Sequence, residues 1–180
     1  MTRRSAEGAV YVVSGPPGSG KSTVAALLAE DGDSSALVDG DAFFGFLRRG
    51  FVEPWRPAAH EQNAAVLEAS AAATGRLARD GRTVVHDGVV GPWFLERFAA
   101  ACAVADLHYV VLLPPLAVLL DRVTTRRDHP FDDVEAARHM HAAFVAAAPD
   151  PRHVIAGEDG PGATADAVRR AAAAGRLRVT

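Results

Sequence analysis

The stretch Gly15-Pro16-Pro17-Gly18-Ser19-Gly20-Lys21-Ser22, followed by Thr23, decides how the rest of this sequence is interpreted. It matches the pattern G-x-x-x-x-G-K-[ST] in full and lies between an apolar run and a helical stretch, the context of a phosphate-binding loop. Its glycines let successive backbone N–H groups converge on phosphate oxygens. We expect Lys21 to contact the β- and γ-phosphates and the Ser22 hydroxyl to bind Mg²⁺. The motif predicts nucleoside triphosphate binding by Gly15 to Thr23; the alternative is a glycine-rich turn that only caps a helix.

Short apolar runs alternate with helical patterns along the chain. The runs expected to form strands are Ala9–Val13, Ala36–Val38, Thr83–His86, Leu107–Leu113 and His153–Ile155. They lack strict alternation, which is typical of strands buried on both faces of a parallel sheet. The helices expected between them are Lys21–Glu30, Ala42–Arg48, His60–Arg79, Trp93–Ala101, Leu116–Arg126, Asp132–Ala147 and Thr164–Ala174. The alternation predicts one three-layer α/β domain spanning residues 1–180.

Composition narrows the classes of protein to consider. The 180 residues are 49% hydrophobic and 23% charged, with a formal net charge of -3. A nucleic-acid binder usually carries a basic face, so no nucleic-acid partner is expected. No apolar run approaches the roughly 18 residues of a membrane-spanning helix, and no secretory signal is evident, so no membrane partner is expected. With Cys102 as the single cysteine, these features predict a cytoplasmic protein.

Two carboxylates follow the second predicted strand, and one follows the third. Asp39 and Asp41 are separated by a glycine, and Asp87 ends the run Val84–Asp87. Ligands of parallel α/β sheets bind at the carboxyl ends of the strands. We interpret Asp41, with Asp39 as the second candidate, as the group that accepts the proton of an acceptor hydroxyl. The alternative for Asp41 is an N-cap of the helix that follows.

Asp87 is the candidate for a metal or substrate contact, with a simple turn residue as the alternative. No Glu follows Asp87, so the Asp-Glu pair typical of motor ATPases is missing. Lys21 is the only lysine, so the Asn/Thr-Lys-x-Asp guanine signature is missing too. The sequence therefore disfavours a motor ATPase and a GTPase switch of the usual type.

Arginines gather after Pro114-Pro115, where a lid is expected over residues 122–135. Arg122 and Arg126 lie four residues apart and share a helix face, and Arg127 follows. In a small kinase such arginines contact the nucleotide, and we expect Arg126 to neutralise the phosphoryl group during transfer. The alternative is that these cations only complement the dipole at a helix C-terminus.

An aromatic-rich stretch, Phe43–Trp55, marks the predicted acceptor pocket at residues 41–60. Its candidate wall residues, with Trp93 added from a later segment, are Phe44, Phe46, Arg48, Arg49, Trp55 and Arg56. Asp41 and Asp87 are the candidate polar contacts to the acceptor. The alternative is that Phe43 and Phe46, at helical spacing, are core residues.

Taken together, four segments resemble the small P-loop kinases of the nucleotide/shikimate-kinase-like group, nearest to the chloramphenicol phosphotransferase, zeta-toxin and gluconate-kinase types. The segments are Gly15–Thr23, Val38–Phe43, Val84–Val89 and Arg122–Arg127. The resemblance implies a five-stranded parallel sheet of order 2-3-1-4-5 with a mobile lid. It also implies transfer of the ATP γ-phosphate to a small-molecule hydroxyl that contacts Asp41, or Asp39 if the register slips.

Two departures from these relatives limit the acceptor. No His follows the Asp-x-Asp element as in gluconate kinases, and the larger helical additions of zeta-toxins are missing. The function predicted is a phosphotransferase that uses ATP and Mg²⁺ on a metabolite or antibiotic, with Lys21, Asp41, Asp39 and Arg126 as catalytic candidates. A nucleoside or nucleotide kinase, and a non-catalytic ATP-binding resistance or regulatory protein, are the alternatives.

Overall fold

The five predicted strands form one sheet in the computed structural model, which describes residues 6–125, 133–157 and 159–180. The strands are β1 (Val10–Ser14), β2 (Ser35–Asp39), β3 (Thr83–Asp87), β4 (Leu107–Leu112) and β5 (Val154–Ile155). Their order is β2-β3-β1-β4-β5, and every neighbouring pair is parallel. The expected α/β fold, including its 2-3-1-4-5 strand order, is confirmed.

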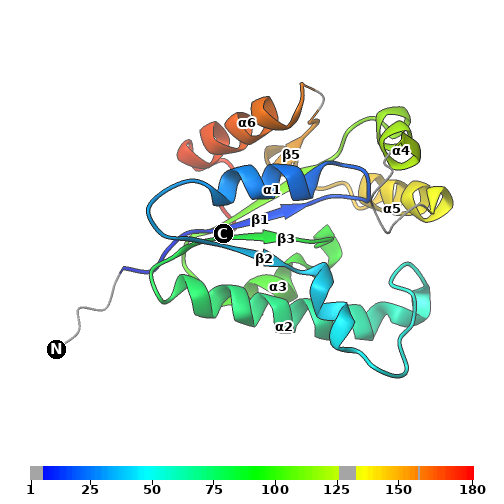
Figure 1. Cartoon of the computed structure of the whole chain (residues 1–180), viewed down its shortest axis with the longest axis horizontal. Helices are drawn as coiled ribbons and strands as arrows, with labels where there is room; N and C mark the ends of the chain where they lie inside the picture. The colour runs from blue at the N-terminus through cyan, green and yellow to red at the C-terminus, as the bar shows by residue number, and fades with distance from the viewer. Residues whose placement is uncertain (1–5, 126–132, 158) are drawn as a thin grey trace.

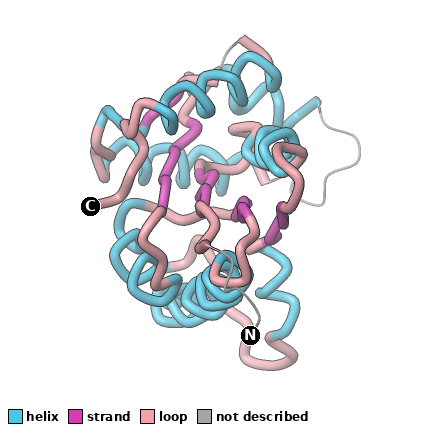
Figure 2. Tube along the Cα trace, turned by 90° about the vertical axis from the view of Figure 1, so that its left-hand side faces the viewer, coloured by secondary structure: helices cyan, strands magenta, loops and turns pink. Residues whose placement is uncertain are grey.

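Helices cover both faces of this sheet (Figure 1). They are α1 (Lys21–Ala29), α2 (His60–Ala78), α3 (Leu95–Cys102), α4 (Leu116–Thr125), α5 (Val134–Ala146) and α6 (Pro161–Ala173). Helices α1 and α6 lie on one face and α2 and α3 on the other, while α4 and α5 lie beyond the carboxyl ends of the strands (Figures 1 and 2). Among the described residues, no helix has the length and apolar character needed to cross a bilayer.

The two faces of the sheet have separate apolar cores because successive strand residues point to opposite sides. In β1, Val12 packs in the core under α2 and α3 with Leu67 and Phe98. Val13 packs instead in the core under α1 and α6, with Val24. Every residue of β4 is buried. This two-sided burial explains why the strands appear in the sequence as continuous apolar runs rather than alternating ones.

The predicted helix Ala42–Arg48 is wrong in type. The chain there forms a short 3₁₀ helix, η1 (Asp41–Phe46), none of whose residues is fully buried. Phe46, expected in the core or the pocket wall, is 74% exposed. A segment this short, with Gly45 inside it, has too little buried apolar surface to stabilise a full α-helix. The predicted helix at Trp93 likewise begins as a 3₁₀ turn over Pro92–Phe94, and α3 follows it.

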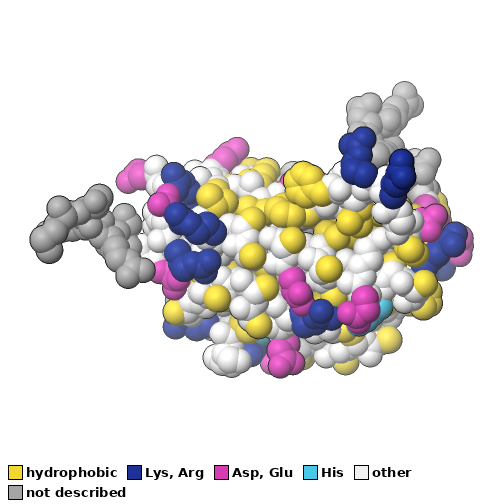
Figure 3. Space-filling view, turned by 90° about the horizontal axis from the view of Figure 1, so that it is seen from below, with side chains coloured by type: hydrophobic (Ala, Val, Ile, Leu, Met, Phe, Trp, Pro, Cys, Tyr) yellow, Lys and Arg dark blue, Asp and Glu magenta, His cyan; other side chains and the backbone are white. Residues whose placement is uncertain are grey.

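Seen from the side of α2, the surface mixes hydrophobic side chains with charges of both signs (Figure 3).

Helix α2 lies against α3 through Gly75, which makes room for the C-terminal turn of α3. A Cβ atom built at Gly75 would overlap the carbonyl oxygen of Cys102. The Arg79 guanidinium donates to that oxygen at 2.8 Å and to the carbonyl oxygen of Ala103 at 3.2 Å. Gly75 and Arg79 thus hold the C-terminal end of α3 against α2.

Replacing Gly75 with Ala should therefore push the two helices apart. We expect Gly75→Ala to lower the free energy of unfolding by about 1–3 kcal/mol, the usual range for overpacking a tight contact. Gly162→Ala is the matched control, because Gly162 lies in α6 with no atom within 4 Å of the added Cβ. Urea denaturation followed by circular dichroism measures both. Equal midpoints for the two variants would contradict the assigned role of Gly75.

Candidate functional site

The phosphate loop leaves β1 and enters α1 with a backbone that only glycine adopts easily. Gly15, Gly18 and Gly20 have φ angles of 149°, 83° and 90°. The Ser19 N–H donates to the Pro16 carbonyl oxygen at 3.1 Å, which closes the turn. Among the described residues no side chain caps α1. The N–H groups of the first turn of α1 therefore remain available to bind phosphate oxygens.

The loop is also packed tightly against α4. A Cβ at Gly18 would lie 2.7 Å from Val123 Cγ2 and 2.8 Å from the Leu119 carbonyl oxygen. Any larger residue at position 18 would have to displace α4, and it would be strained by the positive φ. The loop is thus held in shape by α4 before any ligand binds. This contact links the phosphate loop to the helix that carries Arg122.

Lys21, Ser22 and Asp87 form a polar cluster at the start of α1. Lys21 is only 9% exposed. Burial raises the pKa of the Asp87 carboxyl, while the Lys21 charge and a hydrogen bond from Ser22 act in the opposite direction. Asp87 Oδ1 is buried with no hydrogen-bond partner among the described residues.

This donor set fits a hydrated Mg²⁺. A hard cation prefers hydroxyl and carboxylate oxygens, and Mg²⁺ usually takes one or two protein ligands beside waters and phosphate oxygens. Ser22 and Asp87 supply such oxygens, and Asp87 Oδ1 lacks another partner. The described residues contain no group of three or more His, Cys, Asp or Glu that could hold a metal ion by themselves, without ligands from water or phosphate. Ser22 and Asp87 are therefore the residues that could hold the ion.

Strand register brings the acids of β2 and β3 together. Asp39 and Asp87 are direct partners in the β2–β3 ladder, and the Gly40 N–H donates to the Asp87 carbonyl oxygen at 2.7 Å. The charges of Asp41 and Asp39 both raise the pKa of Asp87, after the larger effect of burial. The three carboxylates that the sequence singled out therefore lie at the same edge of the sheet.

Asp39 and Asp41 have different roles in local structure. Asp39 Oδ1 accepts the backbone N–H groups of Asp41 at 3.0 Å and Ala42 at 3.2 Å, so Asp39 caps η1. The capping role considered for Asp41 is thus held by Asp39. The side chain of Asp41 is left exposed at a cavity. Of the two, Asp41 is the carboxylate that lines the cavity.

His86 is a supporting residue that the sequence analysis missed. Its ring is completely buried, and its Nε2 lies 3.1 Å from the Ser70 hydroxyl of α2. Burial lowers the pKa of His86 to about 4, so the ring is neutral. A Cβ at Gly40 would lie 2.6 Å from the ring, so the imidazole supports the turn between the two Asp residues. The available signal was a polar residue inside an apolar strand, directly before Asp87.

A cavity of about 520 Å³ opens beside the phosphate loop. Of the predicted acceptor residues, Asp41, Phe44, Trp55 and Trp93 line it. Arg48 is exposed and is not among the lining residues, and neither are Arg49, Arg56 or Asp87. Pro17 of the phosphate loop is part of the wall. Lining residues that the sequence analysis missed, Asn63, Leu67 and Met140, come from α2 and α5, and no local pattern connects them to the pocket.

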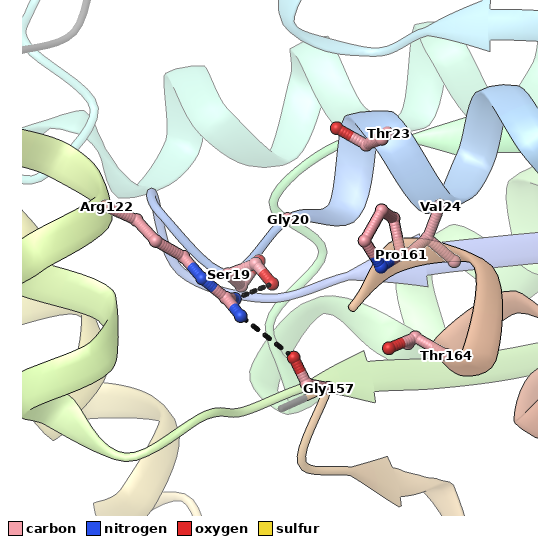
Figure 4. A pocket seen from close by; sticks show the side chains of 8 residues that line it. All are labelled: Ser19, Gly20, Thr23, Val24, Arg122, Gly157, Pro161 and Thr164. Carbon is pink, nitrogen blue, oxygen red and sulfur yellow. Dashed lines mark hydrogen bonds between the residues drawn. The ribbon is translucent and has the colours of Figure 1, made fainter. Parts of the chain in front are cut away.

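A second cavity, of about 230 Å³, lies on another side of the loop (Figure 4). Ser19, Gly20 and Thr23 line it together with Arg122, and the two cavities share no lining residue. Arg122 donates to the carbonyl oxygens of Ser19 at 3.3 Å and Gly157 at 3.0 Å (Figure 4). One arginine of the predicted lid is thus anchored at the phosphate loop. Arg126 and Arg127 lie outside the described residues.

Comparison with known proteins agrees with this architecture. A model of the AAA domain family matches residues 10–151, most of the chain. The chain belongs to the AAA domain family. The comparison of this AAA domain with curated proteins finds no match.

Solved structures similar to this AAA domain include two named as kinases. A sugar kinase from Janibacter sp. HTCC2649 is 18% identical, with a TM-score of 0.67 over 91% of this chain and 93% of that chain. A gluconokinase from Sinorhizobium meliloti 1021 is 21% identical, with a TM-score of 0.64 over 95% and 94%. The tunicamycin resistance protein of Deinococcus radiodurans is 20% identical, with a TM-score of 0.60 over 94% and 96%. These likenesses confirm the resemblance in fold to small P-loop kinases.

Replacing the Asp87 carboxylate with an amide should stabilise the ligand-free protein. We expect Asp87→Asn to raise the Tm at pH 7, because burial outweighs the attraction of Lys21 and raises the Asp87 pKa. A carboxyl whose pKa is higher in the folded than in the unfolded state destabilises the folded state, and this effect is complete when the pH lies above the folded-state pKa. The destabilisation vanishes below the ordinary value of 3.8, so the Tm difference should narrow as the pH falls toward it.

The matched control is Asp159→Asn, which changes an exposed carboxylate in the same way. Thermal unfolding of wild type and both variants from pH 7 to pH 4, without nucleotide, makes the comparison. We expect Mg·ATP to reverse the advantage of Asp87→Asn, since the variant loses an anionic oxygen at the metal position. A Tm difference that does not change with pH would contradict the assignment.

Proposed function

We propose that this protein is a kinase that transfers the γ-phosphate of Mg·ATP to a hydroxyl of a small molecule, such as a metabolite or an antibiotic. The observation that carries the proposal is the position of Pro17, which belongs to the phosphate loop and also lines the cavity that holds Asp41. An acceptor hydroxyl bound in that cavity would lie between the Asp41 carboxylate and the loop that binds the triphosphate. This is the arrangement that in-line phosphoryl transfer to an alcohol requires.

In this scheme the phosphate loop holds the nucleotide. The N–H groups of the loop and of the first turn of α1 donate to phosphate oxygens, and the Lys21 ammonium contacts the β- and γ-phosphates. The cavity beside Ser19, Gly20 and Arg122 would receive the nucleoside part of ATP. Mg²⁺ held by Ser22 and Asp87 would neutralise charge on the phosphate oxygens.

The acceptor side depends on Asp41. Its carboxylate would orient the acceptor hydroxyl and accept its proton as the oxygen attacks the γ-phosphorus. Asp39, at the end of β2, would position Asp41 by accepting the N–H groups of the first turn of η1. We assign Arg126 to the transferred phosphoryl group and Arg127 to the nucleotide, as in the arginine-bearing lids of small kinases.

The structurally similar proteins support the reaction class. Two of them are named as a sugar kinase and a gluconokinase, which supports a hydroxylated small molecule as acceptor. The reaction predicts that ADP forms only when an acceptor is added. A panel of alcohols, sugars, nucleosides, aminoglycosides and phenicols, followed by a search for phosphorylated products in a cell extract, tests it. ADP formation that never depends on an acceptor would reject the kinase.

Removal of the loop ammonium should weaken nucleotide binding. We expect Lys21→Ala to raise the Kd of Mg·ATP roughly 10- to 100-fold, the effect of losing a charge-assisted hydrogen bond. Lys21→Arg keeps the charge but replaces a compact ammonium with a planar fork, so we expect an intermediate Kd. Isothermal titration calorimetry at millimolar Mg²⁺ measures all three proteins. Wild-type affinity in Lys21→Ala would contradict the assignment of Lys21.

Neutralising the proposed base should stop transfer without affecting nucleotide binding. We expect Asp41→Asn to lower kcat by ~10²–10⁴, the usual contribution of general base catalysis, and to leave the Kd of Mg·ATP unchanged. Asp33→Asn, which alters an exposed carboxylate before β2, is the matched control and should keep full turnover. Acceptor-dependent ADP release measures both. Full turnover in Asp41→Asn would dismiss Asp41 as the base.

A further inference from the structure

The chemistry of the 520 Å³ cavity restricts which hydroxyl compound it can take. We propose that the acceptor is an uncharged or cationic alcohol built on an apolar, ring-bearing body, and not a sugar acid or a phosphorylated compound. This inference rests on the proposed phosphotransferase function and names its substrate class. It is carried by three properties of the wall: its aromatic surface, the sign of its charge, and the kind of hydrogen bond it offers.

Five of the thirteen described lining residues are aromatic, and several of these rings are open to solvent. Trp55 is 37% exposed and Trp93 is 41% exposed, although both line the cavity. Ring contacts hold parts of this wall in place: Trp93 lies 5.3 Å from Phe144 between ring centroids, and Phe44 lies 6.5 Å edge-on from Phe51. Large exposed apolar surfaces in a cavity mark a site for an apolar partner. A ring-bearing ligand would cover these side chains and gain from leaving water.

The charge at the cavity is negative. Asp41 is the one charged side chain among the described lining residues, and its negative charge acts on Asp87 together with that of Asp39. Sites that bind carboxylates or phosphates on a substrate usually present arginine forks to them. The described wall contains no Arg, Lys or His, and the exposed Arg48 is not part of it. An anionic acceptor would therefore meet repulsion from Asp41 with no compensating cation in this wall.

Two side-chain oxygens of the wall, from Asp41 and Asn63, accept hydrogen bonds. Asn63 Nδ2 donates to the Pro54 carbonyl oxygen at 2.7 Å, which fixes the orientation of the amide. Asn63 Oδ1 is then left buried with no partner among the described residues. A buried acceptor without a partner is costly, and a ligand donor would satisfy it. Asp41 also accepts, so a ligand with hydroxyl or N–H donors would pair with both oxygens, whereas an ionised carboxylate has no proton to donate to them.

The two tryptophans make a direct binding test possible without nucleotide. Trp55 and Trp93 are the only tryptophans in the chain, and both line the cavity, so tryptophan fluorescence reports on this site alone. Three probes share one phenyl carbinol skeleton and differ in charge: 1-phenyl-1,2-ethanediol is neutral, 2-amino-1-phenylethanol is cationic, and mandelate is anionic. Gluconate serves as a polar, ring-free anion.

We expect the diol and the amino alcohol to change the fluorescence and to saturate. Mandelate should bind about tenfold more weakly than the diol, as expected for a like charge near Asp41. Gluconate should bind more weakly still, because it also lacks the ring. Mandelate or gluconate binding as tightly as the diol, or no saturable binding of the diol and the amino alcohol, would overturn the proposal.

Two variants separate the charge of Asp41 from a general effect on the fold. Asp41→Asn should bring mandelate to within a few-fold of the diol. Arg48→Ala, at an exposed position outside the wall, should leave all four affinities unchanged. Weaker mandelate binding in Arg48→Ala would mean that Arg48 reaches the ligand, and it would overturn the assignment of an anion-excluding wall.

The result is independent of the reaction because no ATP is present. The probes that differ in charge could bind in the expected order while acceptor-dependent ADP formation is never found. In that case the proposed phosphotransferase activity is rejected and the binding preference of the cavity stands. If ADP formation depends on an acceptor but the charge series fails, only the substrate class is rejected.

Discussion

The structure depends on one close contact, that of the phosphate loop with the elements behind it. A loop that turns its N–H groups toward a ligand cannot use them to hold itself in place. Here the anchoring comes from packing, because Gly18 lies against Val123 and Leu119 of α4. Arg122, one turn away on α4, adds hydrogen bonds to the Ser19 and Gly157 carbonyl oxygens. The loop proposed to bind the triphosphate is therefore preformed, and its shape is tied to the helix that leads into the predicted lid.

The parallel sheet brings other candidate site residues next to this loop. Parallel strands end at a common edge, so the segments after β1, β2 and β3 must meet there. Hydrogen bonds hold the segment after β3 in place: Ser14 Oγ donates to the Val90 carbonyl oxygen at 2.7 Å, and the Tyr109 hydroxyl donates to it at 2.6 Å. The buried, neutral ring of His86 supports the turn after β2. Polar groups buried for structural reasons thus place the carboxylates proposed for chemistry.

The cavity beside the loop has a different character. Its charged and amide side chains among the described residues are only Asp41 and Asn63, and most of the other lining residues are aromatic or aliphatic. In the proposed function, such a wall would select by shape, by apolar contact and by exclusion of like charge, whereas the loop would select by donating to phosphate oxygens. Under the proposed function, an anion-binding loop and an anion-excluding cavity would let a polyphosphate and an apolar alcohol approach each other without competing for the same position.

The local features of this protein were readable from its residues. The glycine pattern Gly15–Thr23, the apolar strands and the acids at their ends depend on backbone conformation and burial over a few neighbours, so the sequence alone determined them. The α-helix expected at Ala42 failed, because its stability depended on burial that tertiary packing did not supply. Only the tertiary structure decided that Asn63 and Met140 join Asp41 at one cavity. Contacts between residues so distant in the chain follow from how whole elements pack, and no local pattern records them.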